Sequence, residues 1–307
     1  MTAFLADPVS KRHEPGPGHP ESPARYDAVV KGLADFQLTS FQPRSATEDE
    51  VALCHTRPYI RTARHEVEDG FSQLTTGDTQ LSHDTYDVAL RAVGTVLHAV
   101  DLVFTGQADN AFCVVRPPGH HASANRGMGF CMFNNIAIGA RYAQRRHGAE
   151  RIMIVDWDVH HGNGTQDIFY HDGSVLFFST HQYPWYPGTG AADETGEGRG
   201  EGLTVNCPLP SGTGRVEIWQ AFQDKLKPAA EEFHPDLVMI SAGFDSRVGD
   251  PLGHFLLADR DFADLTRVLR DIAAKHAKGR VVSVLEGGYN LFGLAKAAEA
   301  HAGALQE

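Results

Sequence analysis

Cysteine is scarce in this sequence, and the residues that occur are far apart. Cys54, Cys113, Cys131 and Cys207 form no C-x-x-C pair. This spacing argues against a disulfide framework and against a thiolate zinc cluster, and it predicts reduced thiols inside a cell. Long apolar runs are also missing, since none approaches the roughly 18 residues that a membrane span requires. The N-terminal segment has no long apolar core or cleavage pattern, so we expect a cytoplasmic protein.

Positive charge is in short supply as well. The sequence has 27 Lys and Arg against 39 Asp and Glu, a formal net charge of −12. Such an acidic chain repels phosphate backbones and anionic lipid headgroups, so we expect no general binding to nucleic acid or membranes.

Repeats and low-complexity tracts are absent too. Hydrophobic residues make up 42% of the 307 positions, which is typical of a globular protein with its own core.

What the sequence does contain is an alternation of apolar strands and helices. Short, continuous apolar runs occur at 111–115, 151–155, 175–179, 237–241 and 281–285. Runs of this kind are typical of strands buried on both faces. Helical spacing occurs at 84–104, 134–147, 215–233 and 259–277, and the loop-rich first 50 residues contain one further helical stretch. The alternation predicts a single α/β domain over residues 1–307, with a central parallel sheet flanked by helices.

Four of the apolar runs lead directly into polar clusters. In chain order these clusters read RPPGHH, DWDVHHGNG, AGFDS and EGGYN. The carboxyl ends of parallel strands share one edge of a sheet, and ligand sites form at that edge. The sequence therefore predicts one active site assembled from four strand ends.

Two carboxylates and an imidazole in these clusters predict a metal site. Asp158 and His160 lie two residues apart, and in an extended backbone their side chains point the same way. Asp245 supplies a third ligand from beyond another strand. Two oxygen ligands, one nitrogen and no thiolate leave a position for water, as in catalytic zinc sites. Fe(II), Co(II) and Mn(II) also accept this ligand set, and loop caps or salt bridges are the alternative role for the acids.

Adjacent histidines follow the Pro-Pro-Gly turn. His120 and His121 suit general acid–base catalysis on a metal-activated water, which typically contributes about 10²–10⁴-fold in rate. A catalytic histidine needs an orienting partner on its other ring nitrogen. Asp156 and Asn163 flank the metal ligands and are available for this purpose. Two core or surface histidines without a catalytic role are the alternative.

Aromatic residues recur in glycine-rich segments. Tyr289 follows two glycines that let the backbone bend, and a phenol there can donate to a carbonyl oxygen as an oxyanion develops. Gly129-Phe130 and Trp185-Tyr186 predict two aromatic walls of a narrow channel for a thin apolar chain. Ordinary core packing is the alternative for each of these aromatic residues.

Taken together, the motifs resemble those of the zinc-dependent histone deacetylase family, in the arginase–deacetylase superfamily. RPPGHH, GFCMFNN, DWDVHHGNGTQ, PGTG, SAGFDS and EGGYN occur in the order of that family, and the similarity extends from residues 19–25 to 286–290. HHGNG together with GFDS resembles the class II and bacterial amidohydrolase branches more closely than class I. The resemblance implies an arginase/deacetylase-like fold with its active site at the C-terminal ends of the strands.

The resemblance also implies roles for individual residues. It assigns zinc to Asp158, His160 and Asp245. His121 becomes the general base and acid, His120 its electrostatic partner, and Tyr289 the residue that polarises the substrate carbonyl. Asp156 matches the acid behind His120. Asn163 stands where other branches have aspartate, which implies unequal roles for the two histidines.

A structural potassium ion and a substrate channel are implied as well. The potassium site matches Asp156, Asp158, His160, Ser179 and Thr180. The channel matches Asp78, Gly129, Phe130, Tyr186 and Leu252, with Asp78 as a rim acid and Tyr186 where phenylalanine is frequent. Arg25 matches an arginine on the route by which acetate leaves. Leu252 stands where polyamine-selective relatives can carry glutamate, which removes one reason to favour polyamines.

The expected activity is hydrolysis of a linear amide. Metal-activated water removes an acetyl or another short acyl group from the ε-amine of lysine or from a similar amine. The same chemistry on an acetylpolyamine or another small N-acyl amine is an open alternative. An arginase-type ureohydrolase needs two adjacent manganese ions and more bridging acids, and a non-catalytic acyl-binding scaffold would lack Tyr289 or a zinc ligand. Some bacterial relatives form oligomers, so a homo-oligomer is a further open expectation.

Overall fold

A parallel sheet of eight strands forms the centre of the molecule. The computed structural model describes residues 1 to 307. The strand order is β2-β1-β3-β8-β7-β4-β5-β6, and every neighbouring pair is parallel. The strands are β1 (Thr2–Ala6), β2 (Thr39–Ser40), β3 (Asn110–Val114), β4 (Ile152–Asp156), β5 (Val175–Gln182), β6 (Thr204–Leu209), β7 (Leu237–Ala242) and β8 (Val281–Leu285). The predicted α/β class with a central parallel sheet is confirmed.

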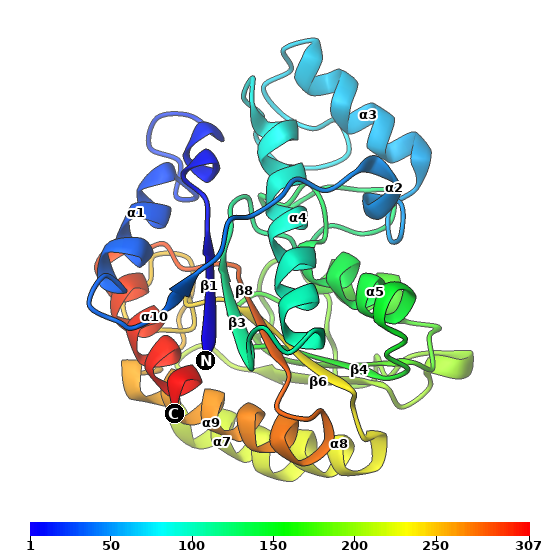
Figure 1. Cartoon of the computed structure of the whole chain (residues 1–307), viewed down its shortest axis with the longest axis vertical. Coiled ribbons are helices and arrows are strands. Elements are labelled where there is room, and N and C mark those ends of the chain that lie inside the picture. The colour runs from blue at the N-terminus through cyan, green and yellow to red at the C-terminus, as the bar shows by residue number, and fades with distance from the viewer.

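Helices cover both faces of this sheet (Figure 1). They are α1 (Pro23–Gly32), α2 (Glu48–Val51), α3 (Arg57–Glu68), α4 (Thr85–Phe104), α5 (Asn135–His147), α6 (Asn163–Phe169), α7 (Arg215–Ala221), α8 (Lys227–Phe233), α9 (Asp259–His276) and α10 (Leu291–Gln306). A π-helical turn joins α7 to α8, and short 3₁₀ turns occupy Pro8–Arg12 and Gly198–Gly200. Helices α4, α5 and α6 contribute to the core on one face, and α1 and α7–α10 to the core on the other. None of the helices combines the length and hydropathy that a membrane span requires.

Burial on both faces explains why the strands are continuous apolar runs. In β4, Ile152 and Ile154 point into the core beneath α4 and α5, whereas Met153 and Val155 point into the core beneath α9 and α10. Successive side chains of a strand alternate between faces, so a strand covered on both faces has no place for solvated residues.

Several elements escape the sequence-based prediction, namely β1, β2, β6, α2, α3, α6 and α10. Strand β1 lies inside the sheet between β2 and β3, although the surrounding 50 residues are rich in loop formers and its five residues do not stand out. Strand β6 contains Asn206 and Pro208, and it forms the edge of the sheet, where a missing N–H is tolerated. Helix α10 follows directly after the EGGYN cluster. The four helices predicted from spacing end within two residues of their expected positions.

The sheet order brings the four polar clusters together. Strands β3, β8, β7 and β4 are consecutive neighbours, although far apart in sequence. Because all are parallel, their carboxyl ends lie side by side at one edge. The loops that leave these strands carry the two histidines, the tyrosine and the predicted metal ligands.

Candidate active site

Two carboxylates and one imidazole face each other at the ends of β4 and β7. Potential ligand atoms of Asp158, His160 and Asp245 all lie within 4.8 Å of one another, and all three residues are buried. His160 Nδ1 is 3.0 Å from Asp158 Oδ1 and 3.2 Å from Asp245 Oδ2. Backbone N–H groups of Val159 and Gly287 each donate to one of the carboxylates at 2.8 Å. The backbone thus fixes both acids in orientation.

This cluster has the properties of a divalent metal site. Glycines leave the space that the carboxylates occupy: a Cβ on Gly287 would stand 2.1 Å from Asp245 Oδ2, and one on Gly243 2.1 Å from Asp158 Oδ2. Burial, together with the charge of Asp158, raises the pKa of Asp245 to about 7. Two carboxylates held together away from water need their charge compensated, and an oxygen–nitrogen–oxygen set fits Zn²⁺ or Fe²⁺.

The local backbone at this site differs from the expectation of an extended chain. Strand β4 ends at Asp156, and bends rather than strand follow it. Asp158 N donates to Asp156 Oδ1 at 3.0 Å, and His160 N donates to Asp158 Oδ1 at 2.9 Å. Side-chain carboxylates therefore shape this turn, in the way that short acidic residues commonly do. The side chains of Asp158 and His160 converge because of the turn, not because of strand alternation.

The first of the adjacent histidines is held in its charged form. His120 Nδ1 is 2.9 Å from Asp156 Oδ2, and its Nε2 is 3.8 Å from Asp158 Oδ2. Burial alone would lower the pKa of His120, but the two carboxylates outweigh burial and raise the pKa to about 10. His120 is therefore an imidazolium at neutral pH.

The second histidine is held neutral. His121 Nδ1 is 2.8 Å from Asn163 Oδ1, and an amide adds no charge. Burial, followed by the charges of His120 and His160, holds the pKa of His121 well below 6.5. Since Asn163 Oδ1 is an acceptor, the Nδ1 atom carries the proton and Nε2 has a free lone pair. The ring of His121 borders the cavity and lies 4.0 Å, centroid to centroid, from that of His120.

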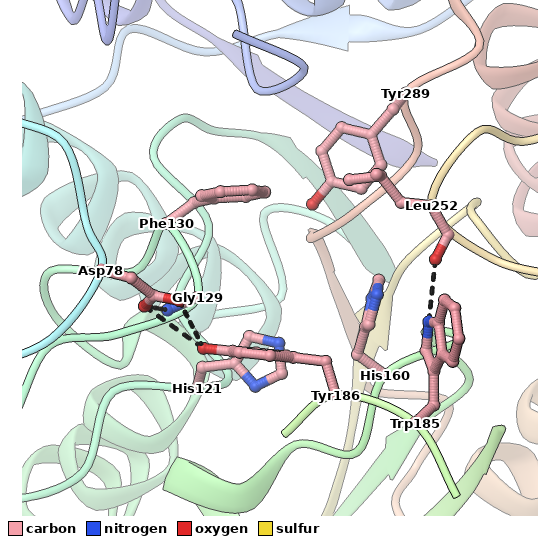
Figure 2. A pocket seen from close by; sticks show the side chains of 9 residues that line it. All are labelled: Asp78, His121, Gly129, Phe130, His160, Trp185, Tyr186, Leu252 and Tyr289. Carbon is pink, nitrogen blue, oxygen red and sulfur yellow. Dashed lines mark hydrogen bonds between the residues drawn. The ribbon is translucent and has the colours of Figure 1, made fainter. Parts of the chain in front are cut away.

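Tyr289 enters the same cavity from the loop after β8. Gly288 adopts a positive φ of 121°, which turns the chain, and Asp250 Oδ2 accepts the backbone N–H of Tyr289 at 2.6 Å. Burial raises the pKa of Tyr289 well above 10, against the opposing charge of Arg25. The hydroxyl is therefore a neutral donor, and Figure 2 shows it directed into the cavity.

Arg25 lies behind the tyrosine and lines no part of this cavity. Its Nε donates to Gly288 O at 2.7 Å and its Nη2 to Glu286 O at 2.5 Å, while Nη1 pairs with Glu21 at 3.0 Å. The guanidinium lies 5.0 Å from the centroid of the Tyr289 ring. The fully buried arginine thus fixes the loop that carries Tyr289.

The cavity itself has a volume of about 230 Å³. Its lining combines the predicted channel residues with predicted catalytic groups: Asp78, His121, Gly129, Phe130, His160, Trp185, Tyr186, Leu252 and Tyr289. Figure 2 shows the Phe130 and Tyr186 rings on opposite sides of it. The sequence-predicted aromatic walls therefore border one space together with His160 of the metal cluster.

The residues predicted for potassium share Asp158 and His160 with the metal cluster and extend from it to the ends of β4 and β5. Asp156 pairs in register with Ser179 across β4 and β5. Ser179 Oγ is 2.9 Å from His181 Nδ1, and the buried Thr180 Oγ1 has no protein hydrogen-bond partner. Asp158 and His160 complete the predicted set on the adjoining turn.

Sequence reasoning missed one buried acid in the site. Glu286 Oε2 accepts the backbone N–H of Gly119 at 2.7 Å and that of His120 at 3.2 Å. Burial raises the pKa of Glu286 to about 7, although the charge of His120 opposes this. Glu286 anchors the turn that presents both histidines. An acid directly after a buried strand was the available signal.

Comparison with known proteins gives a consistent result. The model of the histone deacetylase domain matches residues 19–305. Histone deacetylase 6 of Caenorhabditis elegans is 44% identical over 94% of this chain, which spans only 32% of that protein. A probable deacetylase of Archaeoglobus fulgidus is 41% identical, covering 92% of this chain and 79% of the relative. Human polyamine deacetylase HDAC10 is 43% identical over 90% of this chain and 43% of its own length.

A solved structure gives the same picture. The crystal structure of the HDA15 HD domain superposes with a TM-score of 0.94 at 38% identity, covering 99% of this chain and 89% of that one. Its agreement extends over the whole sheet and its helices. The domain match, the relatives and the shared fold together show that the chain belongs to the histone deacetylase family.

Proposed function

We propose that this chain is a metal-dependent amidohydrolase that removes an acetyl or another short acyl group from the ε-amine of lysine or from a similar amine. One observation carries the proposal: His160 of a metal-type cluster, a neutral histidine and a neutral phenol border a single narrow cavity. These are the parts that attack on an amide carbonyl requires.

Asp158, His160 and Asp245 would hold the metal, with Zn²⁺ as the first candidate and Fe²⁺ as the second. The ion would act as a Lewis acid and lower the pKa of a water molecule toward about 7. The remaining chemistry belongs to side chains of this chain.

His121 moves the proton. Its Nδ1–H is held by Asn163 Oδ1, which leaves the Nε2 lone pair to take the proton from the attacking water. The same atom then delivers that proton to the leaving amine nitrogen, so that acetate and a free amine result. His120 stays protonated beside Asp156, and its positive charge stabilises the oxyanion that develops on the substrate.

Tyr289 acts on the carbonyl oxygen. Its hydroxyl donates a hydrogen bond that strengthens as negative charge develops there. Glu286 and Arg25 act through other groups: Glu286 positions the histidine turn and Arg25 positions the Gly288–Tyr289 loop.

The channel favours a thin apolar linker between the amide and the rest of the substrate. Phe130, Tyr186 and Leu252 supply apolar surface, whereas Asp78 is the one acid at the mouth. A small acetylpolyamine is the second candidate, because a human relative of 43% identity is named a polyamine deacetylase. Leu252 adds no negative charge for a second ammonium, which favours the lysine substrate.

Acetate release tests this proposal. The purified chain is given an acetyl-lysine peptide and, separately, an acetylpolyamine, each with and without a zinc chelator. We expect release from the peptide that stops on chelation and returns when Zn²⁺ or Fe²⁺ is added. Release from the polyamine alone would replace the substrate and keep the mechanism. No release from either substrate after metal is restored would contradict the acetyl specificity, and longer acyl chains would then be tested.

Four expectations from the sequence stay predictions. They are a structural potassium ion, a cytoplasmic location, a homo-oligomer, and the absence of binding to nucleic acid and membranes. Potassium is supported by the buried, unpartnered Thr180 Oγ1 beside Ser179. Acetate release measured with potassium or sodium as the sole monovalent cation tests that site.

A further inference from the structure

The acid at the mouth of the cavity connects three separate loops. Asp78 lies between α3 and α4, and its Oδ1 accepts the backbone N–H of Gly129 at 2.7 Å. The hydroxyl of Tyr186, from the loop after β5, donates to Asp78 Oδ1 and Oδ2 at 3.3 and 3.2 Å. Figure 2 shows both contacts on one carboxylate. The groups come from parts of the chain that are otherwise far apart in sequence.

The Gly129 contact anchors one aromatic wall. Gly129 and Phe130 both adopt left-handed backbone conformations, with φ of 57° and 67°. A side chain on Gly129 would collide with His121, since its Cβ would stand 2.2 Å from Cδ2 of that ring. This conformation is costly for a phenylalanine and persists only where the surroundings hold it. The hydrogen bond to Asp78 is part of that support.

The Tyr186 contact anchors the opposite wall. Its ring lies 5.2 Å from that of His121, centroid to centroid, and its side chain is 37% exposed. Neighbouring Trp185 donates to Leu252 O at 3.0 Å, and farther along the loop Thr189 contacts His161. The hydroxyl is thus the polar contact that ties the Tyr186 ring to the far side of the mouth. Burial and the charge of Asp78 raise the pKa of Tyr186, so the phenol keeps its proton.

We propose that Asp78 and the Tyr186 hydroxyl form a clamp that sets the distance between the Phe130 and Tyr186 walls, and that this clamp restricts the cavity to substrates with an unbranched chain. The substrate class rests on the proposed function, whereas the clamp itself does not. A branched chain must push the walls apart and therefore break the hydrogen bond to Asp78. An unbranched chain leaves the bond intact.

Two peptides measure this selectivity. One carries acetyl-lysine, and the other carries the same side chain with one added methyl group on its γ-carbon. We expect Tyr186→Phe, which keeps the ring and loses the hydroxyl, to lower the ratio of kcat/KM for unbranched over branched peptide about two- to tenfold, the range of one hydrogen bond. An unchanged ratio would overturn the clamp as the source of selectivity.

Variants of Asp78 separate the clamp from a direct contact between the acid and the substrate. Asp78→Asn retains an oxygen that accepts from Gly129 and Tyr186, so the ratio should stay near that of the parent. Asp78→Ala removes the acceptor for both Gly129 and Tyr186 and should lower the ratio at least as far as Tyr186→Phe does. Combining Tyr186→Phe with Asp78→Ala should lower it no further than Asp78→Ala alone, because that variant has already lost the Tyr186 contact. A loss in Asp78→Asn equal to that in Asp78→Ala would show that charge, and not the clamp, determines the ratio.

A fluorescence measurement tests the clamp without any activity. In a Trp219→Phe background two tryptophans remain, and Trp157 is fully buried while Trp185 is 38% exposed. Quenching by acrylamide therefore reports Trp185, the neighbour of Tyr186. We expect Tyr186→Phe and Asp78→Ala to increase quenching and Asp78→Asn to leave it unchanged. Equal quenching in all variants would overturn the clamp even if the enzyme proved inactive, which keeps its failure distinct from failure of the proposed function.

Discussion

At the scale of single residues, the two adjacent histidines differ in the side chain that contacts their Nδ1 atoms. His120 faces the carboxylate of Asp156, whereas His121 faces the amide of Asn163, at nearly equal distances of 2.9 and 2.8 Å. The carboxylate raises the pKa of one ring, while burial and the charge of that ring lower the pKa of the other. A protonated and a neutral imidazole therefore lie side by side, as catalysis by a proton acceptor with electrostatic support requires.

Replacing the amide tests this division of roles. In Asn163→Asp, a carboxylate beside His121 should raise the pKa of His121 by about one unit or more. The base must be neutral to accept a proton. As the solution is acidified, the variant should therefore lose activity at a higher pH than the parent does. The acid limb of the kcat/KM profile measures this shift. Bound zinc is determined at each pH, and an unmoved limb at constant zinc would contradict the role of His121.

Tyr289 gives a second prediction at this scale. Tyr289→Phe should lower kcat about 10²–10³-fold, because it removes one donor to the developing oxyanion. The zinc content should not change, since the phenol belongs to no ligand set. Acetate release and metal analysis measure the two quantities. Tyr142→Phe, on α5 and away from the cavity, is the matched control, and equal turnover in both variants would remove Tyr289 from the mechanism.

At the scale of elements, the strand ends determine whether a metal fits. Gly243 directly follows β7 and Gly287 is the second residue after β8, and each leaves room for a carboxylate. Gly287→Ala would place a Cβ 2.1 Å from Asp245 Oδ2 and 2.6 Å from Asp158 Oδ2. We expect loss of most bound zinc and of activity, with the circular dichroism spectrum retained. Metal analysis after equilibration with excess Zn²⁺ checks this.

A glycine elsewhere supplies the control for that variant. Gly303 lies in α10, and a Cβ there would meet nothing closer than 3.5 Å, at Phe36. Gly303→Ala should keep its zinc and gain as much as about 1 kcal/mol in helix stability. Full zinc binding by Gly287→Ala would contradict the view that these glycines make room for the ligands.

Prediction of the elements worked where the signal was local. The strands buried on both faces and the long amphipathic α4 and α9 were visible in periodicity alone. Strand β1 was not, because its place between β2 and β3 depends on pairing with distant segments. Strand β6 was not visible in the sequence either. The prediction relied on continuous apolar runs, and a strand at the edge of the sheet does not need to be one.

At the scale of the whole molecule, a buried histidine links stability to pH. His301 on α10 contacts Thr266 on α9 at 2.7 Å and Ser283 on β8 at 2.8 Å. Burial lowers the pKa of His301 from 6.5 to about 3. Between these values the unfolded chain binds a proton that the folded chain does not, so stability is fully present above pH 6.5 and falls as pH decreases.

His301→Gln should reduce this dependence. Glutamine retains a donor and an acceptor but does not titrate. Below pH 6.5 the free energy of unfolding of the variant should therefore fall less steeply than that of the parent, by up to about 1.4 kcal/mol per pH unit. Urea unfolding of parent and variant at several pH values, both in chelator, measures the difference. Parallel pH profiles would contradict the assignment of His301 as a neutral buried group.

The sequence by itself determined which polar and aromatic residues gather after the strands and to which strand ends they belong. Periodicity and short motifs are local properties, and parallel strands bring their carboxyl ends to one edge by geometry alone. Tertiary structure alone decided the partners: the bends that make Asp158 and His160 converge, the position of Glu286 beneath His120, and the Tyr186 contact with Asp78. These contacts join segments up to 166 positions apart, as between His120 and Glu286, and their distances depend on how the whole sheet and its loops pack.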